Sequence, residues 1–429
     1  MTSTEQPAQP DAAQVPSGCD PSRIAVLTRG FTGGGVQKMS LHIARELTAR
    51  GWQVDLVSRK DGDRSGLPDG VRPVVLAPRI GLAGRWAALR ADPGGLAALS
   101  RPVLGCLIAP EPLRYLPSLV EYLGRARPRA LLSATTYLNL VALWARRRAG
   151  VSTRVLVSER DSLSENLQSG RSRRAWRWRF VPELLARCYP WADGVVAVSN
   201  GVGEDLAKLT GLESSLFRTV YNPVVTDAVD AQCKAPTGDA WFDADAPPVV
   251  LSVGRLVAKK QLSVLLQAFA TLRRERAARL LIVGEGPERG RILREARRLG
   301  IAGDVRVTGW TDNPYAYMSQ AAVFAMTSNR EGFGNVLVEA LYCGCPVVST
   351  DCPSGPAEIL EQGRFGALVP VGDVAAVARA LAAALDAPTP REALRARGAE
   401  FTTARTTDAY LEAVGLPRWP EPLTAGAQG

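Results

Sequence analysis

The chain has 429 residues, of which 46% are hydrophobic and 22% charged, and its formal net charge is +10. This length is enough for two domains with separate hydrophobic cores. The positive charge favours acidic partners: nucleotide phosphates, lipid pyrophosphates, an anionic membrane surface or nucleic acid. No apolar run reaches membrane-spanning length, and the first twenty residues lack the apolar core of a signal peptide.

The seven cysteines predict neither a zinc site nor a disulfide framework. Cys343 and Cys345 are only two positions apart, and Cys352 follows in a different segment. An odd number of cysteines without paired spacing is typical of a reducing cytoplasm. We therefore expect a cytoplasmic protein that meets a membrane only peripherally, at its inner face.

The first part of the chain predicts a doubly wound α/β domain over residues 21–224, after a disordered leader over residues 1–20. A buried strand over 24–28 is followed by three glycines, an amphipathic helix from Val36 to about Arg50, and a second strand over 52–57. Ligands sit at such strand-loop-helix junctions, which makes Gly34 and Gly35 candidate binding residues. Further strands are expected around Val74 and over 103–108, 130–133, 153–158 and 194–199.

Residues 225–247 are rich in Asp, Ala and Pro and lack periodicity, so they predict a linker between domains. A second doubly wound domain follows over residues 248–404, where strands over 249–253, 280–283, 305–307, 322–326 and 346–349 alternate with helices. This alternation predicts a parallel sheet that is covered on both faces. Residues 405–429 are expected to form a helix and a loose, proline-rich tail.

The most informative stretch is Glu331-Gly332-Phe333-Gly334, between the strand over 322–326 and a helix that begins near Asn335. A glycine loop that opens a helix presents free N–H groups and the positive end of the helix dipole, which suits a phosphate. Glu339 lies one turn into the helix, where its carboxylate can accept hydrogen bonds from ribose hydroxyls. Glu331 is free to bind the hydroxyls of a second group, so the pattern predicts a sugar at one end and a nucleoside at the other.

A second loop, Gly254-Arg255-Leu256-Val257-Ala258-Lys259-Lys260, directly follows a strand. An arginine and a lysine there can clamp a diphosphate, the arginine through its planar fork and the lysine as a point charge. Two unpaired cations at a helix start would be mildly unfavourable against the dipole, so a bound anion explains them better.

The pattern Glu331-Gly332-Phe333-Gly334-x4-Glu339 resembles the Glu-x7-Glu signature of glycosyltransferase family 4, whose members are retaining enzymes of the GT-B fold. The resemblance implies two Rossmann-like domains that face a cleft, with the last helix returning to the first domain. It assigns catalytic roles to Glu331, Arg255 and Lys260. It assigns donor binding to Gly34, Gly35, Gly254, Gly284, Glu285, Gly309, Gly332, Phe333, Gly334, Asn335, Val336 and Glu339.

The implied reaction moves a sugar from a nucleoside diphosphate sugar to an acceptor hydroxyl, with retention and without a metal or other cofactor. Asp243 and Asp245 have the spacing of a metal-binding pair but lie in the predicted linker. The segments Ser158-Glu159-Arg160 and Ser354-Gly355-Pro356-Ala357-Glu358 resemble the branch of the family that builds cell-surface oligosaccharides. The implied acceptor is a glycan or a lipid-linked glycan precursor.

The sequence departs from the family at one position, because many members place a histidine of the first domain near the donor sugar. The one histidine, His42, is expected to be an exposed helix residue, and Thr135, Tyr137 and Asn139 occupy roughly the corresponding region. The acceptor-side catalytic group is therefore unassigned.

Arginines and aromatic residues alternate over residues 171–180. They predict either an exposed basic helix or a contact with an anionic membrane, and no nucleic-acid-binding motif accompanies them. Two alternative functions remain open for the whole chain: a nucleotide-sugar epimerase of the same architecture, and a non-catalytic nucleotide-sugar-binding or membrane scaffold protein.

Overall fold

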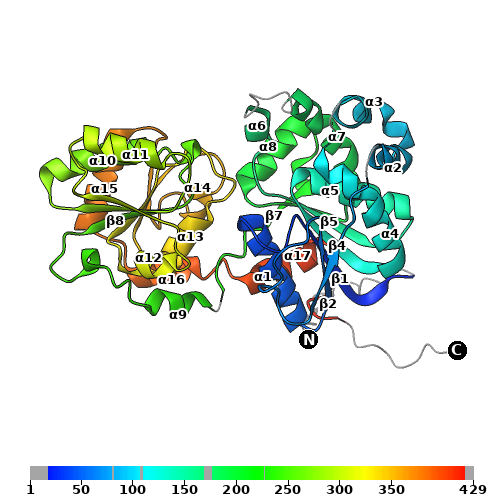
Figure 1. Ribbon diagram of the computed structural model, residues 1–429, viewed down its shortest axis with the longest axis horizontal. Coiled ribbons are helices and arrows are strands. Elements are labelled where there is room, and N and C mark those ends of the chain that lie inside the picture. The colour runs from blue at the N-terminus through cyan, green and yellow to red at the C-terminus, as the bar shows by residue number, and fades with distance from the viewer. Residues whose placement is uncertain (1–17, 80–81, 107–109, 169–175, 227, 421–429) are drawn as a thin grey trace, which may run out of the picture. The chain divides into compact units, whose positions relative to one another are not determined.

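The computed structural model describes residues 18–79, 82–106, 110–168, 176–226 and 228–420 (Figure 1). The chain divides into two compact units. The first unit comprises residues 1–157, 187–195 and 408–429, and the second comprises residues 158–186 and 196–407. The arginines of the predicted membrane patch at positions 171, 173 and 174 lie outside the described residues.

The strands form two sheets, in each of which strand order differs from chain order. The seven-stranded sheet has the order β3 (Val71–Val75), β2 (Gln53–Ser58), β1 (Asp20–Thr28), β4 (Pro128–Ala134), β5 (Arg154–Glu159), β6 (Gly194–Ala197), β7 (Phe217–Thr219). The six-stranded sheet has the order β10 (Val305–Gly309), β9 (Arg279–Val283), β8 (Val249–Val253), β11 (Val323–Met326), β12 (Val347–Thr350), β13 (Ala367–Val369).

Both sheets are doubly wound. The pairings among β1, β2, β3 and β4 and among β8 to β13 are parallel. In each sheet the chain first winds to one side of the first strand and then to the other, as in dinucleotide-binding folds. The predicted pair of doubly wound Rossmann-like α/β sheets is therefore confirmed.

Helices connect the strands along the whole chain. Those before residue 200 are α1 (Gly35–Ala49), α2 (Ala83–Ala91), α3 (Leu96–Leu99), α4 (Leu116–Ala126), α5 (Thr136–Ala149), α6 (Leu163–Gln168) and α7 (Val181–Cys188). Those from residue 200 onward are α8 (Asn200–Thr210), α9 (Ala228–Lys234), α10 (Leu262–Glu275), α11 (Arg289–Arg298), α12 (Pro314–Gln320), α13 (Asn335–Tyr342), α14 (Pro356–Ile359), α15 (Val374–Asp386), α16 (Arg391–Gly398) and α17 (Thr403–Ala413).

The six-stranded sheet is covered by helices on both faces (Figure 1). Helices α10, α11 and α15 lie on one side of β8, and α12, α13 and α16 lie on the other. The core on the α10 side is built from apolar side chains such as Leu266, Phe269 and Leu280, each fully buried. The four central strands β8, β9, β11 and β12 are almost wholly buried, whereas the edge strands β10 and β13 are only partly buried. Strands that are buried on both faces form continuous apolar runs, and such runs predict the strands from the sequence.

Helix α1 follows the predicted pattern, with Met39, Ile43 and Leu47 buried on one face. The sequence predicts that His42 is exposed, but in the structure it is half-buried. It lies beside the buried face rather than opposite it.

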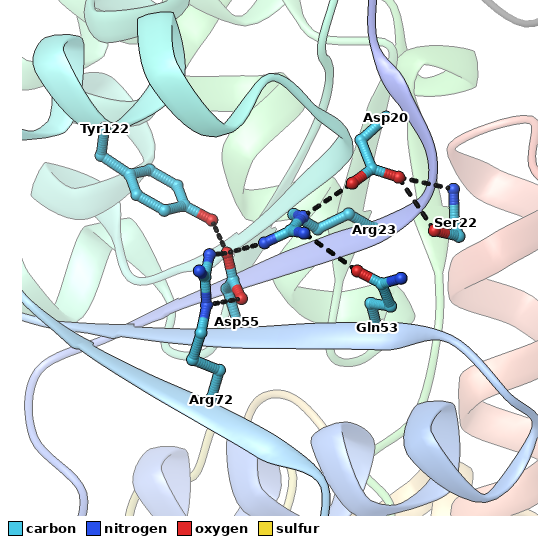
Figure 2. Close-up of polar contacts among 7 residues, drawn as sticks. All are labelled: Asp20, Ser22, Arg23, Gln53, Asp55, Arg72 and Tyr122. Carbon is cyan, nitrogen blue, oxygen red and sulfur yellow. Dashed lines mark hydrogen bonds and ion pairs between the residues drawn. The ribbon is translucent and has the colours of Figure 1, made fainter. Parts of the chain in front are cut away.

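A buried carboxylate links the first strands of the seven-stranded sheet (Figure 2). Asp55 on β2 accepts hydrogen bonds from Arg72 on β3, at 2.7 and 2.5 Å, and from the Tyr122 hydroxyl on α4, at 2.7 Å. Arg23 on β1 lies 3.4 Å from the same carboxylate and is itself held by Asp20 and Gln53. The side chain of Asp55 is 2% exposed, so these partners replace the water that the charge loses on burial.

Two regions of the chain differ from their predicted secondary structure. Residues Ser100–Leu104 form a π-helical turn, so the strand expected over 103–108 is wrong for the described residues up to 106. The apolar pair Val103-Leu104 is compatible with a helical turn as well as with a strand. The predicted linker contains helix α9, although its boundaries, like those of the predicted domains, stay a prediction.

Candidate active site

Four neighbouring strands of the six-stranded sheet end in the predicted loops. Strand β10 ends at Gly309. Its neighbours β9, β8 and β11 are followed by Gly284 and Glu285, by Gly254 and Arg255, and by the loop that contains Glu331. The carboxyl ends of parallel strands share one edge of a sheet, so the structure brings these residues to one edge of the second unit. Ligands of open α/β sheets bind at this edge.

The glycines of these loops allow close packing between loops. The φ angles of Gly254 and Gly284 are both +147°, and a Cβ atom on Gly284 would lie 1.9 Å from the carbonyl oxygen of Gly254. Gly309 has a φ of +86° and pairs with Gly284 in an isolated β-bridge. These glycines are therefore required by the backbone itself, and that requirement alone does not identify a ligand.

Glu331 is the most buried charged group of the candidate site, with 7% of the residue exposed. Its Oε1 lies 2.7 Å from Nζ of Lys260, and its Oε2 lies 3.5 Å from Nζ of Lys259. Burial alone would raise the pKa of Glu331, but the charges of Lys260 and Lys259, together with the hydrogen bonds from Lys260 and Ser328, outweigh it and hold the pKa below its usual range. The carboxylate is thus ionised at neutral pH.

Hydroxyl groups fix the loop that carries Glu331. The fully buried Ser328 donates a hydrogen bond of 2.7 Å to Oε1 of Glu331, and Thr350 on β12 donates one of 2.5 Å to the Ser328 carbonyl. Thr327 donates to the carbonyl of Lys260 at 3.0 Å, which ties this loop to the lysine loop. The carboxylate and the lysines are therefore held in place by backbone contacts, not only by their own charges.

Arg255 is exposed and lines a shallow pocket together with Gly254, Lys260 and Thr327. Among the described residues, no carboxylate lies within salt-bridge distance of its guanidinium. Arg255 and Lys260 thus line the same pocket, and their role as a diphosphate clamp stays a prediction.

The glycine loop leads into α13 as predicted. Gly334, with a φ of +106°, is the N-cap residue, and no side chain of the described residues caps this helix. Asn335 is half-buried and accepts a hydrogen bond of 2.7 Å from Asn222, and Val336 is also half-buried. The first turn of α13 can therefore offer its N–H groups to an anion.

The side chain of Phe333 is 3% exposed and stacks on Tyr221, with ring centroids 5.3 Å apart. It also packs on Phe401, with centroids 5.7 Å apart. Because the ring is enclosed by these two aromatic residues, Phe333 presents its backbone rather than its ring at the loop.

Glu339 and Glu285 also lie near this edge. Glu339 is half-buried on α13 and hydrogen-bonds the hydroxyl of Tyr315, whose pKa is raised by burial and then by the negative charge of Glu339. Glu285 is exposed, and one of its oxygens would lie 3.5 Å from a Cβ on Gly309. The parts of both carboxylates in donor binding stay predictions.

The two oligosaccharide-branch segments also lie in the second unit. A Cβ atom on Gly332 would lie 2.0 Å from the carbonyl oxygen of Arg160, and Ser199 donates a hydrogen bond of 2.9 Å to the Gly332 carbonyl. Glu358 accepts hydrogen bonds from the N–H groups of Asn200 and Gly201, at 2.8 and 3.1 Å. Glu358 thus caps α8 rather than its own helix.

Sequence reasoning missed two charged residues of this region. Glu165 on α6 lies 3.6 Å from Arg330, and both belong to the second unit. Oε1 of Glu165 is buried and accepts no hydrogen bond from the described residues, and burial raises the pKa of this carboxyl. No sequence signal marks Glu165, because it precedes Arg330 by more than 160 positions.

Some predicted residues lie elsewhere. Gly34 and Gly35 form the start of α1 in the first unit, and their part in donor binding stays a prediction. Within the described residues, no group of three His, Cys, Asp or Glu side chains is arranged to hold a metal ion. No helix of the described part of the chain is both long enough and apolar enough to cross a membrane.

Two family models match the chain. The model of Glycosyltransferase Family 4 matches residues 33–228, and the model of Glycosyl transferases group 1 matches residues 247–387. The chain belongs to glycosyltransferase family 4. The second match includes every catalytic residue predicted from the sequence.

Relatives of this family 4 glycosyltransferase include two bacterial enzymes. The chain is 34% identical over 233 residues to the N-acetylgalactosamine-N,N'-diacetylbacillosaminyl-diphospho-undecaprenol 4-alpha-N-acetylgalactosaminyltransferase of Campylobacter jejuni, a match that covers 54% of this chain and 60% of that protein. It is 37% identical over 225 residues to the lipopolysaccharide core biosynthesis glycosyltransferase LpsE of Rhizobium meliloti, covering 51% of this chain and 63% of that protein. The chain thus spans less than two thirds of the length of either relative.

The fold also matches solved structures. The crystal structure of Anabaena HepE in complex with UDP and glucose superimposes with a TM-score of 0.68 at 19% identity, covering 91% of this chain and 99% of that one. At this identity the match establishes the fold of the family 4 chain, the GT-B fold, and leaves its substrates to be argued from its own residues.

Proposed function

We propose that this chain transfers a sugar from a nucleoside diphosphate sugar to an acceptor hydroxyl in the synthesis of a cell-surface or lipid-linked glycan. The observation that carries the proposal is the buried Glu331 carboxylate, held by Lys260 and Ser328 at the edge where the glycine loops meet. A carboxylate that is desolvated yet kept ionised is suited to bind hydroxyl groups of a sugar. The two lysines beside it are suited to the diphosphate of the donor.

The leaving diphosphate would be bound by Arg255, Lys260 and the first N–H groups of α13. An ammonium group has three donors, and Lys260 directs one of them to Glu331, which leaves two for phosphate oxygens. Negative charge grows on the diphosphate as the glycosidic bond to the donor sugar breaks. Fixed positive groups at that point stabilise the transition state more than the bound substrate.

The remaining predicted roles divide between the two ends of the donor. Glu331 would accept hydrogen bonds from the donor sugar, and Glu339 from the ribose. Support for the nucleotide end comes from HepE, which was crystallised with UDP. We propose retention of the anomeric configuration and a metal-independent reaction, because the family signature implies the first and the cluster of cations supplies the charge that a metal would otherwise bring.

The acceptor is proposed from the relatives. The Campylobacter jejuni relative is named for a diphospho-undecaprenol substrate and the Rhizobium meliloti relative for the lipopolysaccharide core. Neither is an epimerase or a scaffold, so the relatives do not support the two alternative functions. The formal net charge of +10 is consistent with a phosphorylated acceptor.

A lipid-linked acceptor would place the chain at the cytoplasmic face of a membrane. The described part of the predicted patch contains Arg177, Trp178, Arg179 and Phe180, of which Arg179 is exposed. Aromatic rings and cations of this kind favour the headgroup region of anionic bilayers. Sedimentation with vesicles of phosphatidylglycerol should exceed sedimentation with phosphatidylcholine alone, and equal sedimentation with both would argue against the contact.

The function is tested with a panel of UDP-, GDP- and ADP-sugars. Calorimetry should find binding of one nucleotide that persists in EDTA, and incubation with a lipid-linked acceptor should release the nucleoside diphosphate. The configuration of the new glycosidic bond, read from the anomeric proton coupling, tests retention separately. Binding without release in the presence of acceptor would favour the scaffold alternative, and no binding to any donor would contradict the proposal.

A further inference from the structure

Two cysteines of the second unit lie side by side although they are 110 positions apart. Cys233 is on helix α9, and Cys343 directly follows the last residue of α13. Their Sγ atoms are 2.9 Å apart. A disulfide bond measures about 2.05 Å, so the sulfur atoms need to approach by less than 1 Å to become bonded.

The neighbouring contacts hold the two cysteines in this position. Ser319 on α12 donates a hydrogen bond of 2.7 Å to the carbonyl of Cys233, and Asn313 donates one of 3.0 Å to the carbonyl of Gln232. Tyr342, the residue before Cys343, donates one of 3.1 Å to Asp230 on α9. Helix α9 is therefore fastened to α12 and to the end of α13 on both sides of the thiol pair.

The two thiols differ in ways that suit successive steps of thiol–disulfide exchange. Cys233 is half-buried, and the hydrogen bond between the two thiols lowers its pKa, so Cys233 is the thiol that forms a thiolate and meets a reagent. Cys343 is buried, and the same hydrogen bond together with burial raises its pKa. A small reagent would thus react first at Cys233.

We propose that Cys233 and Cys343 form a reversible disulfide that links α9 to the end of α13, the helix that carries Glu339. The oxidant is a low-molecular-weight disulfide. The Cys233 thiolate attacks one of its sulfur atoms, which forms a mixed disulfide and releases one thiolate. Cys343 then loses its proton and attacks the Cys233 sulfur, which releases the second thiolate. The two cysteines lose two electrons and two protons, and the reagent is reduced to two thiols.

The bond would close a loop of about 110 residues that contains β8 to β11 and the lysine and glutamate loops of the active site. Cross-links over long loops restrict the unfolded chain most, which stabilises the folded state. The six-stranded sheet would then be more stable under oxidising conditions than under reducing conditions. This inference does not depend on the proposed sugar transfer.

The test is the intact mass of the folded full-length chain after incubation with oxidised glutathione. The wild type should lose two mass units, and digestion without reductant should yield one peptide pair joined through Cys233 and Cys343. The melting temperature should rise by several degrees and return after dithiothreitol. Cys343→Ser should instead keep one glutathione on Cys233, and Cys233→Ser should show neither change.

Cys19 provides the matched control. It is also half-buried, but burial raises its pKa and no other cysteine sulfur lies beside it among the described residues. Cys19→Ser should therefore still lose two mass units. A wild type that keeps its mass, that pairs Cys343 with Cys345, or that loses two mass units even as Cys343→Ser would overturn the proposal.

Discussion

The ammonium of Lys260 and the carboxylate of Glu331 form an ion pair of 2.7 Å at the end of β11, and both side chains are largely buried. Each charge is costly to bury alone, and each removes part of the cost of the other. Loss of either side chain would therefore leave the other charge buried without its partner.

Replacing Lys260 with alanine should lower transfer by roughly 100-fold or more, because one fixed cation near the leaving diphosphate is lost. Lys259→Ala should have a smaller effect, since its Nζ lies 3.5 Å from Glu331 and its side chain is more exposed. Initial rates at saturating donor measure both. Lys208→Ala, an exposed lysine in the last turn of α8, is the control for loss of charge alone. Equal rates in Lys260→Ala and the wild type would refute the site.

The stability of the chain should depend on pH through Glu331. Its pKa in the folded state lies below the ordinary value of 4.5, so its contribution to stability is fully present above that value. The contribution is lost as pH falls through the lower folded-state pKa. The difference in unfolding free energy between the wild type and Glu331→Gln should thus be constant from pH 8 to about 5 and shrink below it. Urea titrations at several pH values measure it, and a difference that stays constant down to pH 3 would contradict the ion pair.

The loops at the sheet edge should not tolerate a side chain on Gly284. Its φ of +147° is strained for any other residue, and the added Cβ would meet the Gly254 carbonyl at 1.9 Å. Gly284→Ala should cost about 2 kcal/mol or more of unfolding free energy. Gly303→Ala is the control, because no atom lies within 4 Å of its added Cβ and its φ is negative or extended. Denaturant midpoints compare the two, and equal midpoints would show that the loops are not packed as described.

Much of this site could be predicted because its charged residues directly follow buried strands. Arg255 and Lys260 follow the run that forms β8, and Glu331 follows the run that forms β11. Parallel strands bring their carboxyl ends to one edge, so a local pattern was enough to place distant loops together. The helix after the glycine loop begins at Asn335, as its periodicity predicts.

The sequence could not predict contacts between segments that are far apart in the chain and share no motif or spacing. Ser328 is only three positions before Glu331, yet its hydrogen bond to that carboxylate depends on the path of the loop, and Thr350 on β12 holds this path by donating to the Ser328 carbonyl. Cys233 and Cys343 have no motif spacing at all. The strand prediction over residues 103–108 was also wrong for the described residues 103–106, because a short apolar run is compatible with a strand or a helical turn.

The carboxylate of Asp55 should be the most sensitive charged position of the first sheet. Its side chain is 2% exposed, and it joins β2 to β3 and α4 through Arg72 and Tyr122. Asp55→Ala removes the acceptor of hydrogen bonds from three side chains, Arg72, Tyr122 and Arg23, so it should cost about 3 kcal/mol or more. Tyr122→Phe removes one hydrogen bond and should cost about 1 kcal/mol.

A substitution at an exposed ion pair shows how much of the loss in unfolding free energy comes from burial of the carboxylate and how much from its charge. Glu121 on α4 pairs with Arg79 at 3.0 Å, and about half of each side chain is exposed. Glu121→Gln should change the unfolding free energy by less than about 1 kcal/mol, because water and salt screen such pairs. Denaturant unfolding at two salt concentrations compares the three variants with the wild type. If Asp55→Ala proved as mild as Glu121→Gln, the buried carboxylate would not be what joins β2 to its neighbours.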